Sequence, residues 1–314
     1  MIQILPLTFL IGLLAVPASA DTATPMLPVP QQVAPHSWAW VGPYGPPTKE
    51  NKGFRMNLGF VVGTEAVAVI DSGYGDPMAE AMLAGIRAVT DKPVRYVIDT
   101  NSQPHRVLGN DRLRREGAQI IADAEAAPRI TGDGEAMSRS AEGVLGLPAE
   151  SVTPPGAPDR TIESDTEIDL GGVRLRLIPV GQAHTQGSLI VEVPEDRMVY
   201  AGDVLYGGRL LAVLPASRVS GWIAAFDRLR GFPDARFVPG HGVPGTLADF
   251  EHPTYAYLTT LKTHMDAAVE AGTDLSDAIT TLDQSPWKGL ADFDELAGRN
   301  AHQAYLEAEA ASFQ

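Results

Sequence analysis

The sequence predicts an α/β fold, and two observations support this prediction. Apolar stretches with the character of β-strands alternate with stretches in which apolar residues recur at helical spacing. Polar side chains able to do chemistry follow the ends of several predicted strands, where a rigid scaffold presents its loops. The 314 residues, 44% of them hydrophobic, suffice for one large domain or for one domain with an appendage.

Strand and helix patterns alternate along the first half of the chain. A helix predicted at 77–89 has Pro77 at its first helical position and Asp76 as its expected N-cap. A second helix is expected at 107–116, where Gly117 ends it. Strand-like runs surround these helices, at 58–63, 66–70, 94–98 and 118–122.

The second half of the chain continues the alternation and ends in helices. An amphipathic helix is predicted at 220–230, and the pattern is helical from residue 253 onward, with a last helix at 299–310. The Pro-rich segment 21–50 is expected to approach the domain in extended form, and 123–165 carry no regular pattern. Further strands are predicted at 173–180, 189–193, 197–201 and 236–238.

The first twenty residues are expected to form a signal peptide. An apolar run at 2–16 precedes Pro17-Ala18-Ser19-Ala20, and its small residues suit cleavage after Ala20. The run is short for a membrane span, so no stable span is expected after cleavage. Because no Lys or Arg precedes the run, an uncleaved anchor or a buried N-terminal helix stays open as an alternative.

Charge and cysteine content narrow the possible partners and ligands. The formal net charge of −15 argues against a nucleic-acid partner, because binding to phosphates needs a basic face. The chain has 0 cysteines, so a metal site must use histidines and carboxylates.

Five short motifs, each after a predicted strand, carry a resemblance to a known family. They begin at Ile70, Thr100, Ala183, Ala201 and Pro239. In this order they resemble the metallo-β-lactamase superfamily, over roughly residues 28–250. The resemblance implies a four-layer αβ/βα sandwich at 21–250, with a C-terminal helical extension at 251–314. This extension is similar to that of periplasmic members linked to sulfur oxidation or quinoproteins, through Pro286-Trp287 and the run from Arg299-Asn300 to Glu307.

The loop that begins at Thr100 departs from the family pattern. The family has Thr-His-x-His-x-Asp-His there, followed by a hydrophobic stretch and Gly-Asn. Thr100 and Gly109-Asn110 match, whereas the ligand positions hold Asn101, Gln103, His105 and Arg106. Asn101 and Gln103 offer only amide oxygens, which suit hard cations better than zinc, and arginine cannot bind a cation.

By resemblance, the family's two metal sites are unequally preserved. The first would keep His184 and Asp203, with Asn101 and Gln103 as weak ligands. The second would keep His105, Asp203 and His241, a workable site for one ion. Zinc is expected there, and iron or manganese also suit these ligand types. The mononuclear subclass of true β-lactamases likewise carries Asn and Arg in this loop, but it uses a cysteine ligand that this chain lacks.

Asp71 and Arg106 are the other predicted site residues. By resemblance, Asp71 orients a ligand of the loop. We hypothesise that it instead forms an ion pair with Arg106, which would keep the pocket folded without a metal. Less specific readings stay open, since Asp71 and Asp203 could be turn residues and His105 could be a solvated loop histidine.

These residues favour two functions of different kinds. One is an exported, periplasmic metallo-hydrolase that holds one ion and cleaves a small ester, lactone, thioester or similar bond with activated water. The other is a catalytically lapsed, metal-free relative that acts as a binding or accessory protein. A small-molecule partner is expected in both cases, and the sequence leaves the oligomeric state open.

Overall fold

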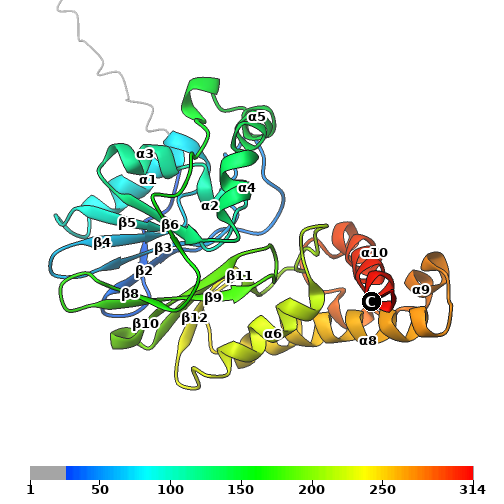
Figure 1. The fold of residues 1–314 in the computed structure, drawn as a ribbon. Coiled ribbons are helices and arrows are strands. Elements are labelled where there is room, and N and C mark those ends of the chain that lie inside the picture. Colours follow the sequence, from blue (N-terminus) through cyan, green and yellow to red (C-terminus); the bar gives the residue numbers. More distant parts are fainter. Residues whose placement is uncertain (1–25, 314) are drawn as a thin grey trace, which may run out of the picture.

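The computed structural model describes residues 26–313 and places two β-sheets face to face, with helices on their outer sides (Figure 1). This arrangement confirms the predicted α/β fold and its layers. The predicted signal peptide at 1–20 lies outside the described residues. No helix among residues 26–313 is both long and apolar enough to cross a membrane.

The first sheet is mixed and has seven strands in sequence order. The strands from β1 to β4 pair antiparallel, and those from β4 to β7 pair parallel. The Pro-rich segment therefore does more than approach the domain, because β1 and β2 form the edge of this sheet. The strands are β1 (Gln31–Gln32), β2 (Ser37–Trp40), β3 (Leu58–Val62), β4 (Val67–Ile70), β5 (Val94–Ile98), β6 (Gln119–Asp123) and β7 (Arg160–Ile162).

The second sheet has five strands in the order β12-β11-β10-β9-β8. All its neighbours pair antiparallel except β11 and β12, which are parallel and are joined through helix α6 (Val219–Leu229). The strands are β8 (Thr166–Asp169), β9 (Arg174–Gly181), β10 (Ser188–Val193), β11 (Met198–Tyr206) and β12 (Arg236–His241).

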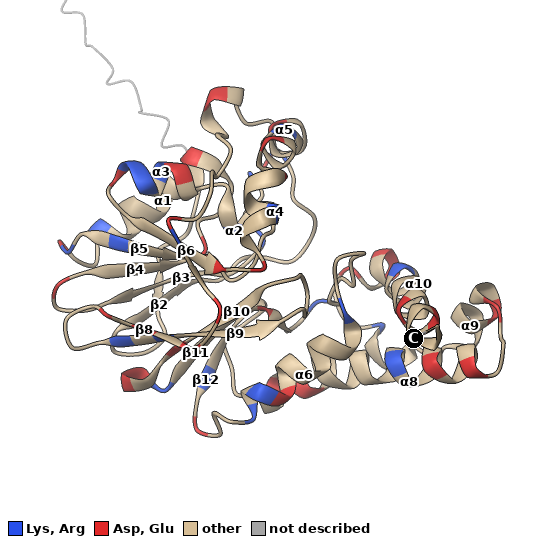
Figure 2. Ribbon diagram, viewed as in Figure 1, with Lys and Arg blue, Asp and Glu red and all other residues tan. Residues whose placement is uncertain are grey.

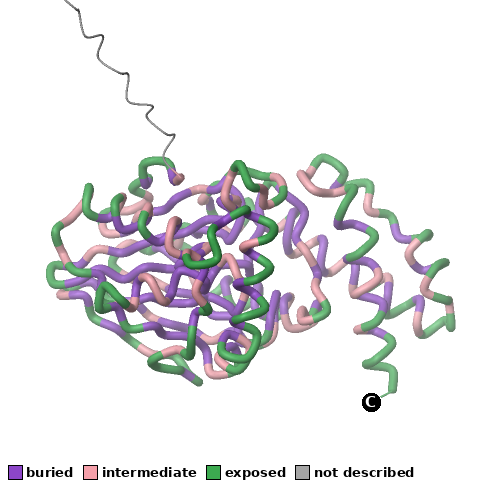
Figure 3. The backbone as a smooth tube through the Cα atoms, turned by 90° about the horizontal axis from the view of Figure 1, so that it is seen from above, coloured by how far each residue is buried: buried purple, intermediate pink, exposed green. Residues whose placement is uncertain are grey.

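The two-residue alternation of strands divides the core into layers. On β4 and β5, Ile70 and Ile98 face the second sheet, whereas Val69 and Val97 face the outer helices. Figure 3 shows the result, with buried strands inside and exposed residues gathered on the outer loops and helices. Charged positions also lie mainly on the helices and loops (Figure 2).

Three predictions about the helices covering the first sheet are wrong. Helix α1 (Gly75–Arg87) begins two residues earlier than predicted, and Asp76 pairs with Arg115 instead of capping it. The helix expected at 107–116 is divided, because the backbone N–H of Gly109 donates to the carbonyl of Gly73 at 3.0 Å and not to a carbonyl of its own helix. The segment 123–165 also contains helices. The elements concerned are α2 (Pro104–Val107), α3 (Asn110–Arg115), α4 (Ala127–Gly132), α5 (Gly134–Leu145) and the 3₁₀ turn Ala149–Ser151.

The C-terminal helices extend to one side of the sandwich (Figure 1). They share a hydrophobic cluster with the second sheet: Trp222 of α6, Leu261 of α8 and Ala301 of α10 all belong to it. The boundary predicted at residue 250 therefore stays a prediction, since one core runs across it. The elements are α7 (Ala248–Phe250), a π-helix (Glu251–Ala256), α8 (Tyr257–Glu270), α9 (Leu275–Thr281), the 3₁₀ turn Ser285–Trp287 and α10 (Phe293–Ser312).

Candidate active site

The motif residues gather at one edge of the two sheets. Asp71 directly follows β4, and the loop from Thr100 follows β5. On the second sheet, Asp203 lies on β11, His241 ends β12 and His184 precedes β10. The two sheets lie face to face and present these strand ends at a common edge, so residues distant in sequence meet here.

The guanidinium of Arg106 lies at the centre of this edge and is fully buried. Its Nη2 donates to Asp203 Oδ1 at 2.6 Å, and its Nε donates to Asp203 Oδ2 at 3.1 Å. Its Nη1 donates to Asp71 Oδ2 at 3.0 Å and to the carbonyl of Asn57 at 2.7 Å, and Nη2 also reaches the carbonyl of Gly240 at 3.3 Å. The guanidinium therefore has partners for all its N–H groups, which a buried cation requires.

Asp203 is the carboxylate that most side chains of the site contact. Besides Arg106, it accepts a hydrogen bond from Asn101 Nδ2 at 2.8 Å. Burial alone would raise the pKa of Asp203, but Arg106 and the histidines beside it hold that pKa well below its usual range. Asp203 is therefore an anion at neutral pH. A Cβ at Gly240 would collide with its carboxylate, so the close approach of β12 to β11 requires glycine there.

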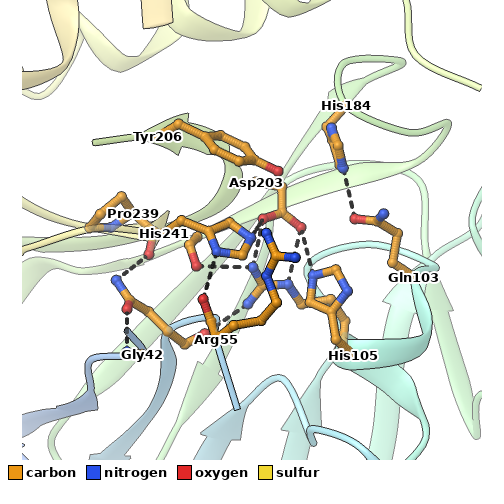
Figure 4. A network of polar contacts seen from close by, with 12 residues as sticks. Gly42, Arg55, Gln103, His105, His184, Asp203, Tyr206, Pro239 and His241 are labelled. Carbon is orange, nitrogen blue, oxygen red and sulfur yellow. Dashed lines mark hydrogen bonds and ion pairs between the residues drawn. The ribbon is translucent and has the colours of Figure 1, made fainter. Parts of the chain in front are cut away.

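His105 and His241 approach the same carboxylate from two sides (Figure 4). His105 Nε2 lies 3.3 Å from Asp203 Oδ2, and His241 Nε2 lies 3.4 Å from Asp203 Oδ1. His241 Nδ1 donates to the carbonyl of Arg55 at 2.9 Å, which leaves its Nε2 as the free lone pair. Burial lowers the pKa of His105 to about 4 and that of His241 to about 3, so both imidazoles are neutral.

These three residues fit a metal ion. One ligand atom from each of His105, Asp203 and His241 lies within 4.8 Å of the others. Among residues 26–313, the buried His105 Nε2 has no hydrogen-bond partner, because its 3.3 Å contact with Asp203 Oδ2 lacks hydrogen-bond geometry. An unpartnered buried nitrogen is costly unless a ligand completes it. Two neutral imidazoles and a carboxylate are the donor set of an open mononuclear site.

His184 is held apart from that group. Its Nε2 lies 2.7 Å from Gln103 Oε1, and its ring meets the edge of Trp222. Asn101 Oδ1 accepts a hydrogen bond from the backbone N–H of Gln103 at 2.8 Å. The side-chain amides of Asn101 and Gln103 thus bind protein groups in place of a metal, and the structure brings His105, Asp203 and His241 together without them.

Asp71 forms the predicted ion pair with Arg106 and also anchors the start of the loop. Its Oδ1 accepts hydrogen bonds from the backbone N–H of Thr100 at 2.8 Å and from the Thr100 hydroxyl at 2.9 Å. Its backbone is left-handed, with φ of 63°, a conformation that Asp tolerates better than most residues. Burial raises the pKa of Asp71 to about 6, although Arg106 opposes this shift.

A cavity of about 210 Å³ opens above the histidines, and sequence reasoning missed several of its walls. Tyr206 stacks on His241 with ring centroids 4.9 Å apart, and Arg55, Arg209 and Glu295 also line the cavity. Tyr206 comes three residues after Asp203 on β11, which was the available signal. Nothing local to Arg55 or Glu295 indicates that they meet at this site.

The fold and this site define the class of protein. A family model described as "Metallo-beta-lactamase superfamily" matches residues 53–241, so the chain belongs to the metallo-β-lactamase superfamily. A solved metallo-β-lactamase from Pontibacter korlensis has the same fold, with a TM-score of 0.58, 22% identity, and coverage of 73% of this chain and 98% of that chain.

Curated relatives with different reactions match about the same part of the chain. The acyl-coenzyme A thioesterase MBLAC2 of Gallus gallus is 28% identical over 60% of this chain and 73% of its own length. The 2,4-dinitroanisole O-demethylase subunit alpha of Nocardioides sp. is 27% identical, covering 59% and 52%. The linear primary-alkylsulfatase of Pseudomonas sp. is 20% identical, covering 57% and 40%. The family thus includes hydrolases of several bond types.

Proposed function

We propose that this chain is a hydrolase that uses one metal ion, held by His105, Asp203 and His241, to cleave a small ester, thioester or lactone. The observation that carries the proposal is the convergence of two neutral imidazoles and one carboxylate on a common point beneath the cavity. The donor set suits zinc best, and iron and manganese are the alternatives.

The charges of the buried cluster favour a bound cation. Asp71 and Asp203 carry two negative charges when ionised, whereas Arg106 supplies one positive charge and the histidines are neutral. A buried net charge is unfavourable. Two negative charges and one positive charge leave a net −1, which attracts a cation to His105, Asp203 and His241, while Arg106 would take the place of a second ion.

The residues of the chain prepare this site in three ways. Arg106 keeps Asp203 ionised and fixes the plane of its carboxylate. The carbonyl of Arg55 fixes the tautomer of His241, and Tyr206 fixes the ring plane. A metal bound here would polarise a substrate carbonyl and lower the pKa of a bound water.

The proposal that the substrate is a thioester or an ester rests on the relatives of this chain. The relative from Gallus gallus is by name an acyl-coenzyme A thioesterase. The cavity of about 210 Å³ is small, so we propose that it takes the reacting end of the substrate while the remainder projects outward. We also propose export to the periplasm, on the basis of the sequence at 1–20, and no role in binding nucleic acid.

One observation favours a second function, that of a metal-free binding protein. Arg106 already engages both carboxylate oxygens of Asp203, at 2.6 and 3.1 Å, so the centre has an internal cation. In this alternative the cavity would bind a small molecule without cleaving it.

Hydrolysis with and without metal separates the two functions. Protein stripped with a chelator would be assayed on a nitrophenyl ester, a lactone and an acyl thioester, before and after adding zinc, iron(II) or manganese. The proposal expects a metal-dependent rate that His241→Ala abolishes and that His302→Ala, outside the site on α10, leaves intact. Absence of metal stimulation on every substrate would instead support the binding protein.

A further inference from the structure

A second cluster of charged residues lies in the wall of the same cavity, and the catalytic proposal does not use it. Arg55 and Arg209 both line the cavity. Arg209 Nη2 lies 2.8 Å from Asp292 Oδ2, and Arg55 Nη2 lies 3.4 Å from the same oxygen. Two guanidiniums therefore share a single carboxylate.

This cluster has a surplus positive charge in a mostly dry place. The side chains of Arg55, Arg209 and Asp292 are 16%, 7% and 12% exposed. Burial lowers the pKa of Arg55, and the neighbouring charge of Arg209 lowers it further. Glu295, the acidic residue that lines the cavity, is well exposed and pairs with Arg299 at 3.4 Å. Within residues 26–313, the two arginines thus have no second carboxylate partner.

Arg209 also has an unused hydrogen-bond donor. Its Nε is buried and has no hydrogen-bond partner in the described part of the chain, although a buried donor without an acceptor costs free energy. Its guanidinium lies 5.8 Å from the centre of the Tyr206 ring, and Tyr206 stacks on His241. The arginine pair is therefore connected to the candidate metal ligands by one aromatic ring.

The C-terminal helices build this cluster. The backbone N–H of Leu210 donates to the carbonyl of Ala291 at 2.9 Å, and that of Ala291 donates to the carbonyl of Gly208 at 3.1 Å. These bonds fix Asp292, at the start of α10, beside Arg209. Asp292 has a left-handed backbone with φ of 62°. Such a conformation persists where surrounding contacts hold it, here the two arginines.

We propose that Arg55 and Arg209 bind an anionic oxygen group of the substrate, a carboxylate or a sulfate or phosphate ester, and orient its scissile bond toward His105, Asp203 and His241. This inference rests on the proposed function and adds the class of substrate to it. Guanidinium forks recognise planar and tetrahedral oxyanions through paired hydrogen bonds. Asp292 holds the pair in place until the ligand anion competes for it.

Binding of simple anions to metal-free, full-length protein tests the proposal without any hydrolysis. Calorimetric titrations would use sulfate, butyrate and neutral butyramide at constant ionic strength. We expect at least one anion to bind and butyramide not to bind. Butyrate as the better ligand would indicate a carboxylate substrate, and sulfate as the better ligand a sulfate or phosphate ester.

Three variants locate the binding. Arg209→Gln should lower the affinity for the anion about tenfold or more. Arg174→Gln, which makes the same change of charge at an exposed position, should leave the affinity unchanged. Asp292→Asn should raise the affinity for the anion, because it removes the carboxylate that competes with the anion for the two arginines. A purely structural role for the cluster would instead give an unfolded or weakened Asp292→Asn protein with no gain in affinity. Equal affinities in Arg209→Gln and Arg174→Gln, or no anion binding at all, would overturn the proposal.

The outcome is separable from that of the proposed function. Anion binding that depends on Arg209, in a protein that cleaves nothing, would keep the arginine site and remove the hydrolase. Metal-dependent cleavage with no dependence on Arg209 in the binding titrations would do the reverse.

Discussion

Arg106 binds Asp203 through two parallel hydrogen bonds, from Nη2 at 2.6 Å and from Nε at 3.1 Å, and both side chains are buried. In the superfamily pattern that this chain resembles, position 106 carries a metal-binding histidine. The guanidinium of Arg106, a permanent cation, therefore occupies the position at which the family has a histidine that binds a metal cation. The candidate ligands His105 and His241 approach Asp203 from its other sides.

Removing the guanidinium should be severely destabilising. Arg106→Met keeps much of the volume but leaves Asp71 and Asp203 as buried carboxylates without their cation, at an expected cost of about 3–5 kcal/mol in the free energy of unfolding. Urea denaturation at pH 7 measures it. Arg139→Met, at an exposed helical pair, should cost less than about 0.5 kcal/mol. Similar losses in both variants would contradict the central role of Arg106.

The lost first metal site should be recoverable by two substitutions. Gln103 already contacts His184, and Asn101 already contacts Asp203, so both side chains point at the remaining ligands. We expect the double variant Asn101→His and Gln103→His to bind one metal equivalent more than the wild type. Equilibrium dialysis against zinc measures the stoichiometry, and an unchanged value would show that the backbone of this loop does not permit the site.

Acid should destabilise the metal-free protein through His184. Burial lowers the pKa of His184 from 6.5 to about 4. A group with a lowered folded-state pKa stabilises the fold above its unfolded value, and this contribution is lost as the pH falls from 6.5 toward 4. Asp71, whose pKa is raised, acts in the opposite sense.

A comparison of variants isolates the histidine. Between pH 7 and pH 5, His184 should contribute about 2 kcal/mol to the loss in free energy of unfolding. His184→Gln should therefore show a smaller loss over this interval than the wild type, as measured by urea denaturation at each pH. The same pH dependence in both proteins would mean that His184 is not kept neutral by burial.

Gly240 should be irreplaceable even by alanine. A Cβ there would collide with Asp203 Oδ1 and with the backbone of Gly202, so Gly240→Ala should cost about 1–3 kcal/mol and lower the affinity for metal. Gly298→Ala is the control, because a Cβ on that part of α10 meets open space, and it should stabilise the helix by up to about 1 kcal/mol. Thermal unfolding and zinc titration of both variants check these expectations.

The sequence predicted the layers of the fold and the ion pair between Asp71 and Arg106, because strand patterns and ordered motifs are local signals. The two hydrogen bonds from Arg106 to Asp203 could not be predicted from the sequence. The residues are 97 positions apart, and nothing in the loop specifies the direction of the guanidinium. The same holds for Arg209 and Asp292, which only the packing of the C-terminal helices brings together. Within the loop, the helix is interrupted at Gly109, whose backbone N–H donates to the carbonyl of Gly73, a tertiary contact without a local pattern.

Metal content is the most direct test of the account. Untagged protein, purified without chelators, would be analysed by mass spectrometry for zinc, iron and manganese. We expect about one equivalent in the wild type and in His184→Ala, and almost none in His105→Ala or His241→Ala. A wild-type protein that holds no metal and gains none from zinc at neutral pH, or a His241→Ala protein that keeps its metal, would contradict the mononuclear site.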